Sequence, residues 1–68
     1  MKSVDAMGLS CPEPVIMAKR ALKDSPDGIE IKVDNVASRE NVSRYLEAMG
    51  LKVSVEEGRG EWRITGRR

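Results

Sequence analysis

The chain has 68 residues, of which 40% are hydrophobic and 34% charged, so its length and composition describe one small folded domain rather than a disordered segment. Its formal net charge of +1 gives no general reason to expect binding to nucleic acid or to an anionic membrane. Because it has no histidine and one cysteine, Cys11, it can form neither an intramolecular disulfide nor a cysteine-rich zinc site.

Apolar spacing and turn-forming residues predict four segments in the first half of the chain. These are a brief strand at 3–6, a turn at 7–10, a helix from about Pro12 or Pro14 to Lys23, and a strand at 29–33. The helix has apolar residues at helical spacing and tolerates proline in its first turn, where the missing N–H costs nothing. The second strand alternates between apolar and polar residues, which places Ile29, Ile31 and Val33 on one face.

The second half predicts a helix and two more strands. After a connection at 34–37, Ser38 is the expected N-cap of a helix that Gly50 closes in the left-handed conformation. Its inward stripe is expected to be Val42, Leu46 and Met49, with Tyr45 at the edge. Strands follow at 51–55 and around Trp62 and Ile64, joined by a hairpin loop at 58–60.

The predicted order is therefore β-α-β-α-β-β, which indicates the α+β class. Each strand has one apolar and one polar face, so the sheet is expected to be covered on one side only. Two helices suffice to cover four short strands, giving a two-layer sandwich with an open polar sheet face and a single domain over residues 1–68. No apolar stretch suits a signal peptide or a membrane span, and an unpaired thiol fits a reducing compartment, so we expect a cytoplasmic protein.

Cys11 is the one candidate nucleophile with an unusual setting. It ends a glycine-containing turn and stands at a helix entry, where the helix dipole favours a thiolate. The alternative is a small buried apolar side chain, since free cysteine is often buried. Glu13 adds a like charge beside the sulfur, and Pro12 and Pro14 lack N–H donors, which opposes the effect of the helix entry. The prolines fix the backbone, which suits a thiol presented to a partner.

Residues 5–16, Asp-Ala-Met-Gly-Leu-Ser-Cys-Pro-Glu-Pro-Val-Ile, resemble the signature of the TusA (SirA-like) sulfur-carrier family. Its hallmark is Gly-Leu-x-Cys-Pro-x-Pro just after a first strand, and this sequence keeps every fixed position. Residues 33–35 and 40–42 further resemble the N-terminal domain of YedF-type proteins, which are linked by name to selenium metabolism. The resemblance spans essentially the whole chain.

The resemblance implies a four-stranded mixed sheet with the last strand between the second and third. It also implies a sulfurtransferase-type relay, in which Cys11 accepts persulfide sulfur from a cysteine desulfurase or other donor protein. The sulfur then passes to a downstream acceptor protein, as in thiolation of transfer RNA or in other sulfur-related or selenium-related metabolism. The supporting motif residues are Gly8, Leu9, Pro12, Glu13 and Pro14. Such a relay needs one thiol and no cofactor or metal.

Three basic residues near the motif, Lys19, Arg20 and Lys23, are either a solvated helix face or a docking surface for an acidic partner or for RNA. Direct RNA binding is not expected, because aromatic residues make up only 3% of the chain and stacking platforms need them. The alternative to a sulfur carrier is a non-catalytic interaction or redox-regulatory module, with Cys11 as a sensor thiol.

Overall fold

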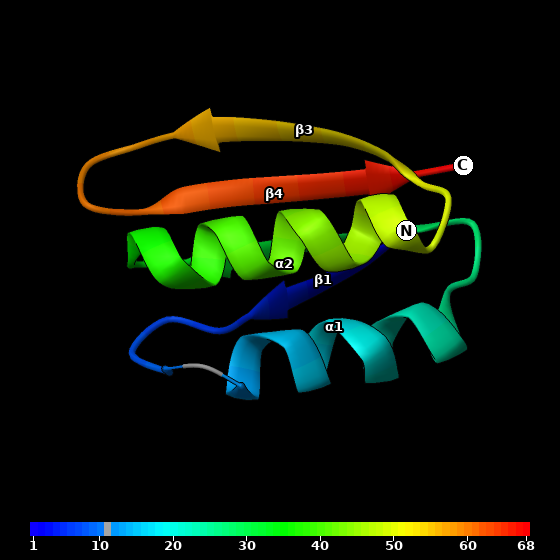
Figure 1. Ribbon diagram of the computed structural model, residues 1–68, viewed down its shortest axis with the longest axis horizontal. Helices are drawn as coiled ribbons and strands as arrows, with labels where there is room; N and C mark the ends of the chain where they lie inside the picture. The colour runs from blue at the N-terminus through cyan, green and yellow to red at the C-terminus, as the bar shows by residue number, and fades with distance from the viewer. Residues whose placement is uncertain (11) are drawn as a thin grey trace.

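Six helices and strands follow one another in the predicted order. A computed structural model describes residues 1–10 and 12–68. Its elements are β1 (Lys2–Asp5), α1 (Glu13–Asp24), β2 (Gly28–Val33), α2 (Val36–Ala48), β3 (Lys52–Glu57) and β4 (Trp62–Arg67). The sheet order is β1-β2-β4-β3, with β1 parallel to β2 and the other pairs antiparallel. Both helices lie on one face of the sheet (Figure 1), which confirms the mixed two-layer α+β sandwich.

The core lies between the sheet and the two helices. The alternation predicted for β2 is confirmed, since Ile29, Ile31 and Val33 are all fully buried. Ile64 of β4 and Leu46 of α2 are also fully buried, and α2 packs over β4. The burial of these aliphatic side chains is the main source of stability, which for a chain of this size amounts to roughly 3–10 kcal/mol in total.

The expected ends of α2 are partly wrong. Asn35, not Ser38, is the N-cap: its side-chain Oδ1 accepts the Ser38 N–H at 2.8 Å, and Ser38 lies inside the helix and is buried. Met49, expected in the inward stripe, follows the last helical residue and is 43% exposed. Gly50 has the predicted left-handed conformation, with φ of +84°, and turns the chain so that Leu51 is buried instead.

The other predicted boundaries differ by one or two residues. β1 begins and ends one residue earlier than expected, and α1 begins at Glu13, between the two alternatives, and ends at Asp24. The hairpin loop spans residues 58–61, one residue longer than predicted, and the Gly58 N–H donates to the Glu61 carbonyl at 2.8 Å. Trp62 is half-buried, and the guanidinium carbon of Arg39 lies 5.3 Å from the centroid of its ring.

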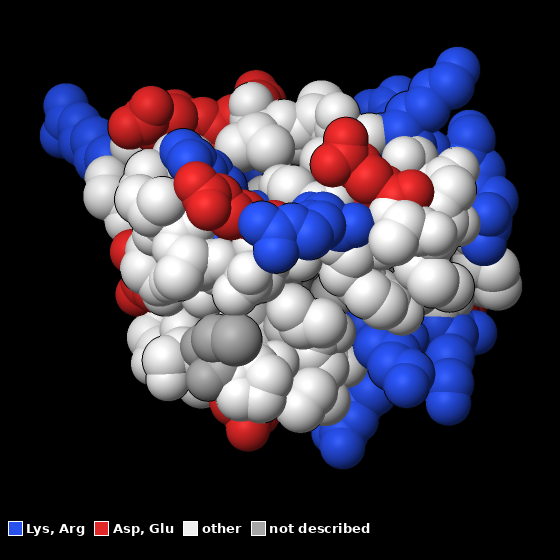
Figure 2. Space-filling view, in the orientation of Figure 1, with Lys and Arg blue, Asp and Glu red and all other residues white. Residues whose placement is uncertain are grey.

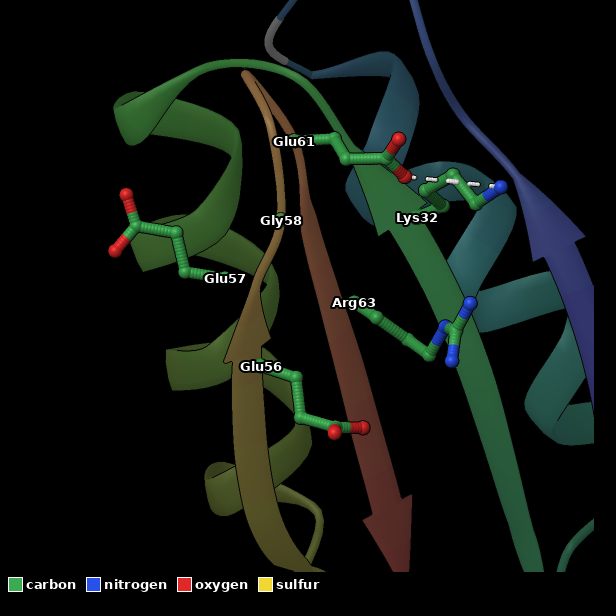
Figure 3. Close-up of a pocket in the computed structure, with 6 residues that line it drawn as sticks. All are labelled: Lys32, Glu56, Glu57, Gly58, Glu61 and Arg63. Carbon is green, nitrogen blue, oxygen red and sulfur yellow. Dashed lines mark ion pairs between the residues drawn. The ribbon is translucent and has the colours of Figure 1, made fainter.

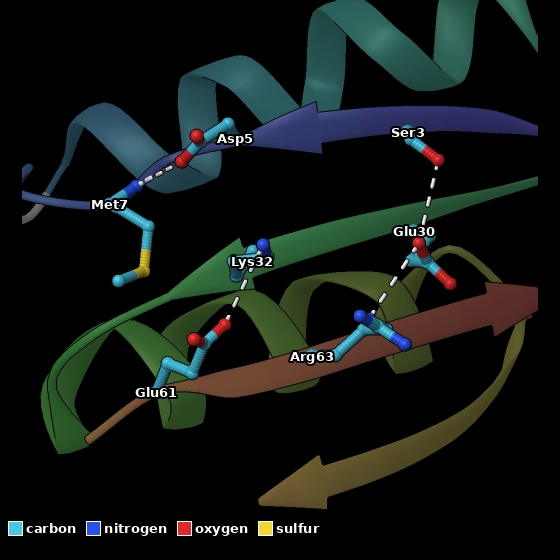
Figure 4. A network of polar contacts seen from close by, with 7 residues as sticks. All are labelled: Ser3, Asp5, Met7, Glu30, Lys32, Glu61 and Arg63. Atoms are coloured by element: carbon cyan, nitrogen blue, oxygen red, sulfur yellow. Dashed lines mark hydrogen bonds and ion pairs between the residues drawn. The ribbon is translucent and has the colours of Figure 1, made fainter. Parts of the chain in front are cut away.

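The open face of the sheet carries charged side chains that pair with one another (Figure 4). Arg63 Nε lies 3.8 Å from Glu30 Oε1, and the Ser3 hydroxyl donates to the same oxygen at 3.4 Å. Lys32 Nζ lies 3.7 Å from Glu61 Oε2. The two aromatic residues of the chain pack instead against the core, so this face carries no aromatic stacking platform. In the described part of the chain no helix is long and apolar enough to cross a membrane.

One surface ion pair predicts a measurable titration shift. Lys2 Nζ donates to Asp24 Oδ2 at 2.7 Å, and this hydrogen bond, with the opposite charge, lowers the pKa of Asp24 below its ordinary value of 3.8. The pair therefore stabilises the fold above the pKa that Asp24 has in the unfolded chain, and the contribution is lost as pH falls through the lower folded pKa. Lys2→Met is expected to return the Asp24 pKa toward 3.8 in a carboxyl NMR titration.

Asp27 is the internal control for that titration. Its pKa is lowered chiefly by the Ser25 hydroxyl, which donates to Asp27 Oδ1 at 2.9 Å, and then by its own backbone N–H. The Lys2→Met change should leave its midpoint almost unmoved. An Asp24 midpoint that stayed in place would contradict the ion pair, and equal movement of both carboxyls would indicate a general change in the fold.

Candidate functional site

The β1–α1 connection, which carries the sequence motif, begins as a continuation of the parallel pairing of β1 with β2. The Ala6 N–H donates to the Lys32 carbonyl at 2.9 Å, and Ala6 is fully buried. The Met7 N–H then donates to Asp5 Oδ1 at 2.9 Å. Gly8 has a φ of +76°, a left-handed conformation in which residues with a side chain are strained. The chain therefore turns at Gly8, the position where the motif supplies a glycine.

Two side chains from the β2–α2 connection hold this turn. Asp34 Oδ2 accepts the Gly8 N–H at 2.8 Å, and Asn35 Nδ2 donates to the Leu9 carbonyl at 3.2 Å. The same Nδ2 lies 3.3 Å from Asp34 Oδ1, so the two side chains also bond to each other. Since Asn35 caps α2 through its other atom, Oδ1, one side chain fixes both the start of α2 and the turn before Cys11.

The entry to α1 is held by backbone bonds and by proline. Pro12 occupies the N-cap position, with no side-chain cap, and the Glu13 N–H donates to the Ser10 carbonyl at 2.9 Å. Glu13 places a carboxylate in the first turn, where the helix dipole favours it. Pro14 is fully buried and anchors this turn in the core. Cys11 itself lies outside the described residues.

The surroundings of this connection are exposed and partly apolar. Met7 and Ile16, one on each side of the motif, are each 37% exposed, and Val36, which follows Asn35, is 49% exposed. Pro12 and Ser10 are also exposed. Figure 2 shows that the face below and to the left, where the β1–α1 connection lies, is mostly uncharged. The residues that flank the motif and the residue that follows Asn35 are therefore both apolar and exposed.

The three basic residues of α1 do not form one group. Lys19 and Lys23, four residues apart on one side of the helix, line a hollow with Tyr45 and other residues. Arg20 lines a different hollow, with Lys2, Val4, Met17, Ala21 and Asp24. Lys19 and Lys23 therefore line one hollow, and Arg20 lines another.

A hollow of about 290 Å³ on the open sheet face is lined mainly by charged residues (Figure 3). It is lined by Lys32, Glu56, Glu57, Gly58, Glu61 and Arg63. Lys32 and Glu61 pair within it, and the Glu57 carboxylate points away from that pair. Among the described residues no three histidine, cysteine, aspartate or glutamate side chains are grouped to hold a metal ion. The hollow therefore does not offer a metal centre from this part of the chain.

Asp34 and Asn35 are not identified as site residues by the sequence alone. They are part of the resemblance to YedF-type proteins, but their sequence position suggests only a connection between strand and helix. These residues could have been identified from the strand pairing. The carboxyl ends of neighbouring parallel strands meet at one edge of a sheet, so polar residues that follow β2 reach the turn that follows β1.

Comparisons with known proteins identify the family. The model of the family described as sulfurtransferase TusA matches residues 2–68. A candidate sulfur carrier protein of Methanocaldococcus jannaschii is 37% identical over 67 residues, which cover 94% of this chain and 89% of that protein. The sulfur carrier protein TusA of Pseudomonas syringae pv. syringae is 32% identical over 56 residues, covering 79% of this chain and 67% of that protein.

A solved structure agrees with the sequence comparisons. The SirA-like protein of Desulfitobacterium hafniense superposes with a TM-score of 0.86 at 37% identity, covering 98% of this chain and 96% of that one. The likeness includes both the topology and almost the full length. The chain belongs to the sulfurtransferase TusA family.

Proposed function

We propose that this chain is a cytoplasmic sulfur carrier that holds persulfide sulfur on Cys11. The proposal rests on the two hydrogen bonds that hold the turn before Cys11. Asp34 accepts the Gly8 N–H, and Asn35 donates to the Leu9 carbonyl. Together with Pro12 and Pro14 after the cysteine, these bonds give the motif a fixed backbone on both sides. A fixed backbone suits a thiol that must meet the reacting sulfur of another protein at a defined angle.

The proposed chemistry is exchange between sulfur atoms. The Cys11 thiolate attacks the terminal sulfur of a persulfide on a donor protein, forming a new S–S bond at Cys11 and breaking the S–S bond of the donor. The donor cysteine leaves as a thiolate. In delivery, an acceptor thiolate attacks the outer sulfur in the same way and Cys11 is released. Each step exchanges one S–S bond for another, so it needs no external oxidant, metal or cofactor.

The exposed apolar residues around the motif support protein donors and acceptors. Met7, Ile16 and Val36 give a partner a surface on which to dock while its reactive sulfur reaches Cys11. We propose a cysteine desulfurase as the donor and a second protein as the acceptor, with residues 1–68 acting as one domain. A reducing cytoplasm keeps the single thiol available.

The test is intact-mass measurement after incubation with a cysteine desulfurase, cysteine and the desulfurase's own cofactor. The expected result is a gain of one sulfur atom that reductant removes. Cys11→Ser, of nearly the same size, is the matched control and should gain none. Persulfide on the Ser variant would contradict the assignment to Cys11. Failure to load from a desulfurase, together with ready formation of a sulfenate under mild oxidant, would instead favour a redox-sensor module.

A further inference from the structure

A second surface lies at the end of the molecule opposite the motif, between the last turns of the two helices. α1 and α2 run in the same direction over the sheet, so both C-terminal ends lie away from the β1–α1 connection (Figure 1). Between them is an open hollow of about 320 Å³, called here the C-terminal hollow. None of the residues that line this hollow belongs to the β1–α1 connection.

The C-terminal hollow combines apolar and basic residues. Its apolar lining is Leu22, Pro26, Tyr45 and Met49. Met49 keeps 43% of its surface in solvent, although it is among the larger apolar side chains of the chain. Its basic lining is Lys19, Lys23 and Arg68. An apolar surface bordered by cations is typical of sites that accept an apolar side chain flanked by anionic groups.

Lys19 and Lys23 are available to an incoming anion, and Arg68 adds a fixed positive charge beside them. No ion pair within the described ranges involves Lys19, Lys23 or Arg68. The Arg68 guanidinium is held in place, since Nε donates to the Pro26 carbonyl at 2.7 Å and Nη1 to the Met49 carbonyl at 3.4 Å. Figure 2 shows basic side chains gathered at this end of the molecule, over α1 and beside the end of the sheet. A local excess of positive charge thus exists on a chain that is close to neutral overall.

We infer that the C-terminal hollow docks an acidic segment of a partner protein that carries a large apolar side chain. The positive charge selects an acidic segment, and the leucine, proline and methionine lining selects a protein side chain over a nucleic-acid backbone, which has no apolar group to bury there. This role in the relay rests on the proposed function, because a partner held here stays close while the sulfur exchange takes place. Such tethering raises the effective concentration of the reacting groups.

The binding test uses a fluorescent synthetic peptide in which glutamates flank a Leu-Phe pair, with a Ser-Ser version as its comparison. Binding is measured by fluorescence polarisation and by amide NMR shifts on the Cys11→Ser variant, so the result does not depend on sulfur loading. The expected result is weak binding of the Leu-Phe peptide, with shifts around Lys19, Tyr45 and Met49. Charge reversal by Lys19→Glu with Lys23→Glu should weaken it by roughly tenfold or more.

Arg20→Glu is the matched control, since it reverses one charge on the same helix but lines the other hollow. The Arg20→Glu change should leave the peptide affinity nearly unchanged. Met49→Ser tests the apolar lining, and because Met49 is exposed this change does not remove core packing. No binding at millimolar peptide would overturn the inference, as would equal loss in the Arg20→Glu variant. Binding of a single-stranded RNA that depends on Lys19 and Lys23 but not on Met49 would overturn it in favour of nucleic acid.

Discussion

Replacement of Asn35 with alanine is expected to lower the free energy of unfolding by about 2 kcal/mol and to slow sulfur loading of Cys11. The loss has two parts. The bond from the Ser38 N–H to Asn35 Oδ1 caps α2, and removing an N-cap typically costs about 1 kcal/mol. The bond from Asn35 Nδ2 to the Leu9 carbonyl contributes about 1 kcal/mol more, as a part-buried hydrogen bond. Chemical denaturation and the time course of persulfide formation measure the two effects.

Asn35→Asp separates the effect of the N-cap bond from the effect of the hydrogen bond to the Leu9 carbonyl. Aspartate retains an oxygen to accept the Ser38 N–H, so α2 keeps its cap, but it has no N–H to donate to the Leu9 carbonyl. We expect it to keep more of the stability than alanine does and still to slow loading. Asn35→Ser, which also caps but carries no charge, controls for repulsion from Asp34. Loading at the wild-type rate in both variants would show that Asn35 acts on stability alone.

The regular elements could be predicted from the sequence because their periodicity is local. Ile29, Ile31 and Val33 alternate along β2 and are all fully buried, as expected. The sheet order follows from the family resemblance, and the structure confirms it. A pattern of alternation indicates which face of a strand is buried, but not which strand lies beside it, so periodicity alone could not have given the position of β4.

The two wrong expectations for α2 have a common cause, which is that helix ends depend on the turns beyond them. Asn35 and Ser38 are both good N-cap residues, and the contact of Asn35 with Leu9, a residue distant in sequence, accompanies its role as the cap. At the other end, the Leu51 N–H bonds back to the Leu46 carbonyl at 3.1 Å. This reversal buries Leu51 and leaves Met49 exposed, an outcome that helical spacing cannot show.

The candidate site was predictable in part. The motif itself indicated Gly8 and the prolines, because glycine frees the backbone and proline restricts it locally, whereas Leu9 was indicated only by the family resemblance. The hydrogen bonds from Asp34 to Gly8 and from Asn35 to Leu9 each join residues 26 positions apart. They form because β1 and β2 are paired in parallel, with Val4 opposite Ile31. A contact that depends on strand register requires the topology first, so residue-by-residue reasoning does not reach it.

Leu46→Ala is expected to destabilise the fold by about 2–5 kcal/mol, a large share of the total for a chain of this size. Leu46 is fully buried in the contact between α2 and β4, and the smaller side chain leaves a cavity there. Since α2 also carries the Asn35 cap at its start, loosening the helix is expected to weaken the tie to the turn before Cys11 as well. Thermal and denaturant unfolding measure the stability, and persulfide loading below the unfolding transition measures the effect on the site.

A substitution at Gly66 of β4 tests the contact between Leu46 and β4 from the strand. A Cβ at Gly66 would lie 3.0 Å from Leu46 Cδ1, so Gly66→Ala alone should cost about 1–3 kcal/mol through overpacking. In the double variant the new methyl group occupies part of the space that Leu46→Ala vacates. We therefore expect the double variant to lose less stability than the sum of the single variants, by at least about 0.5 kcal/mol. Strict additivity would contradict the close packing of α2 on β4, because residues in direct contact are expected to couple.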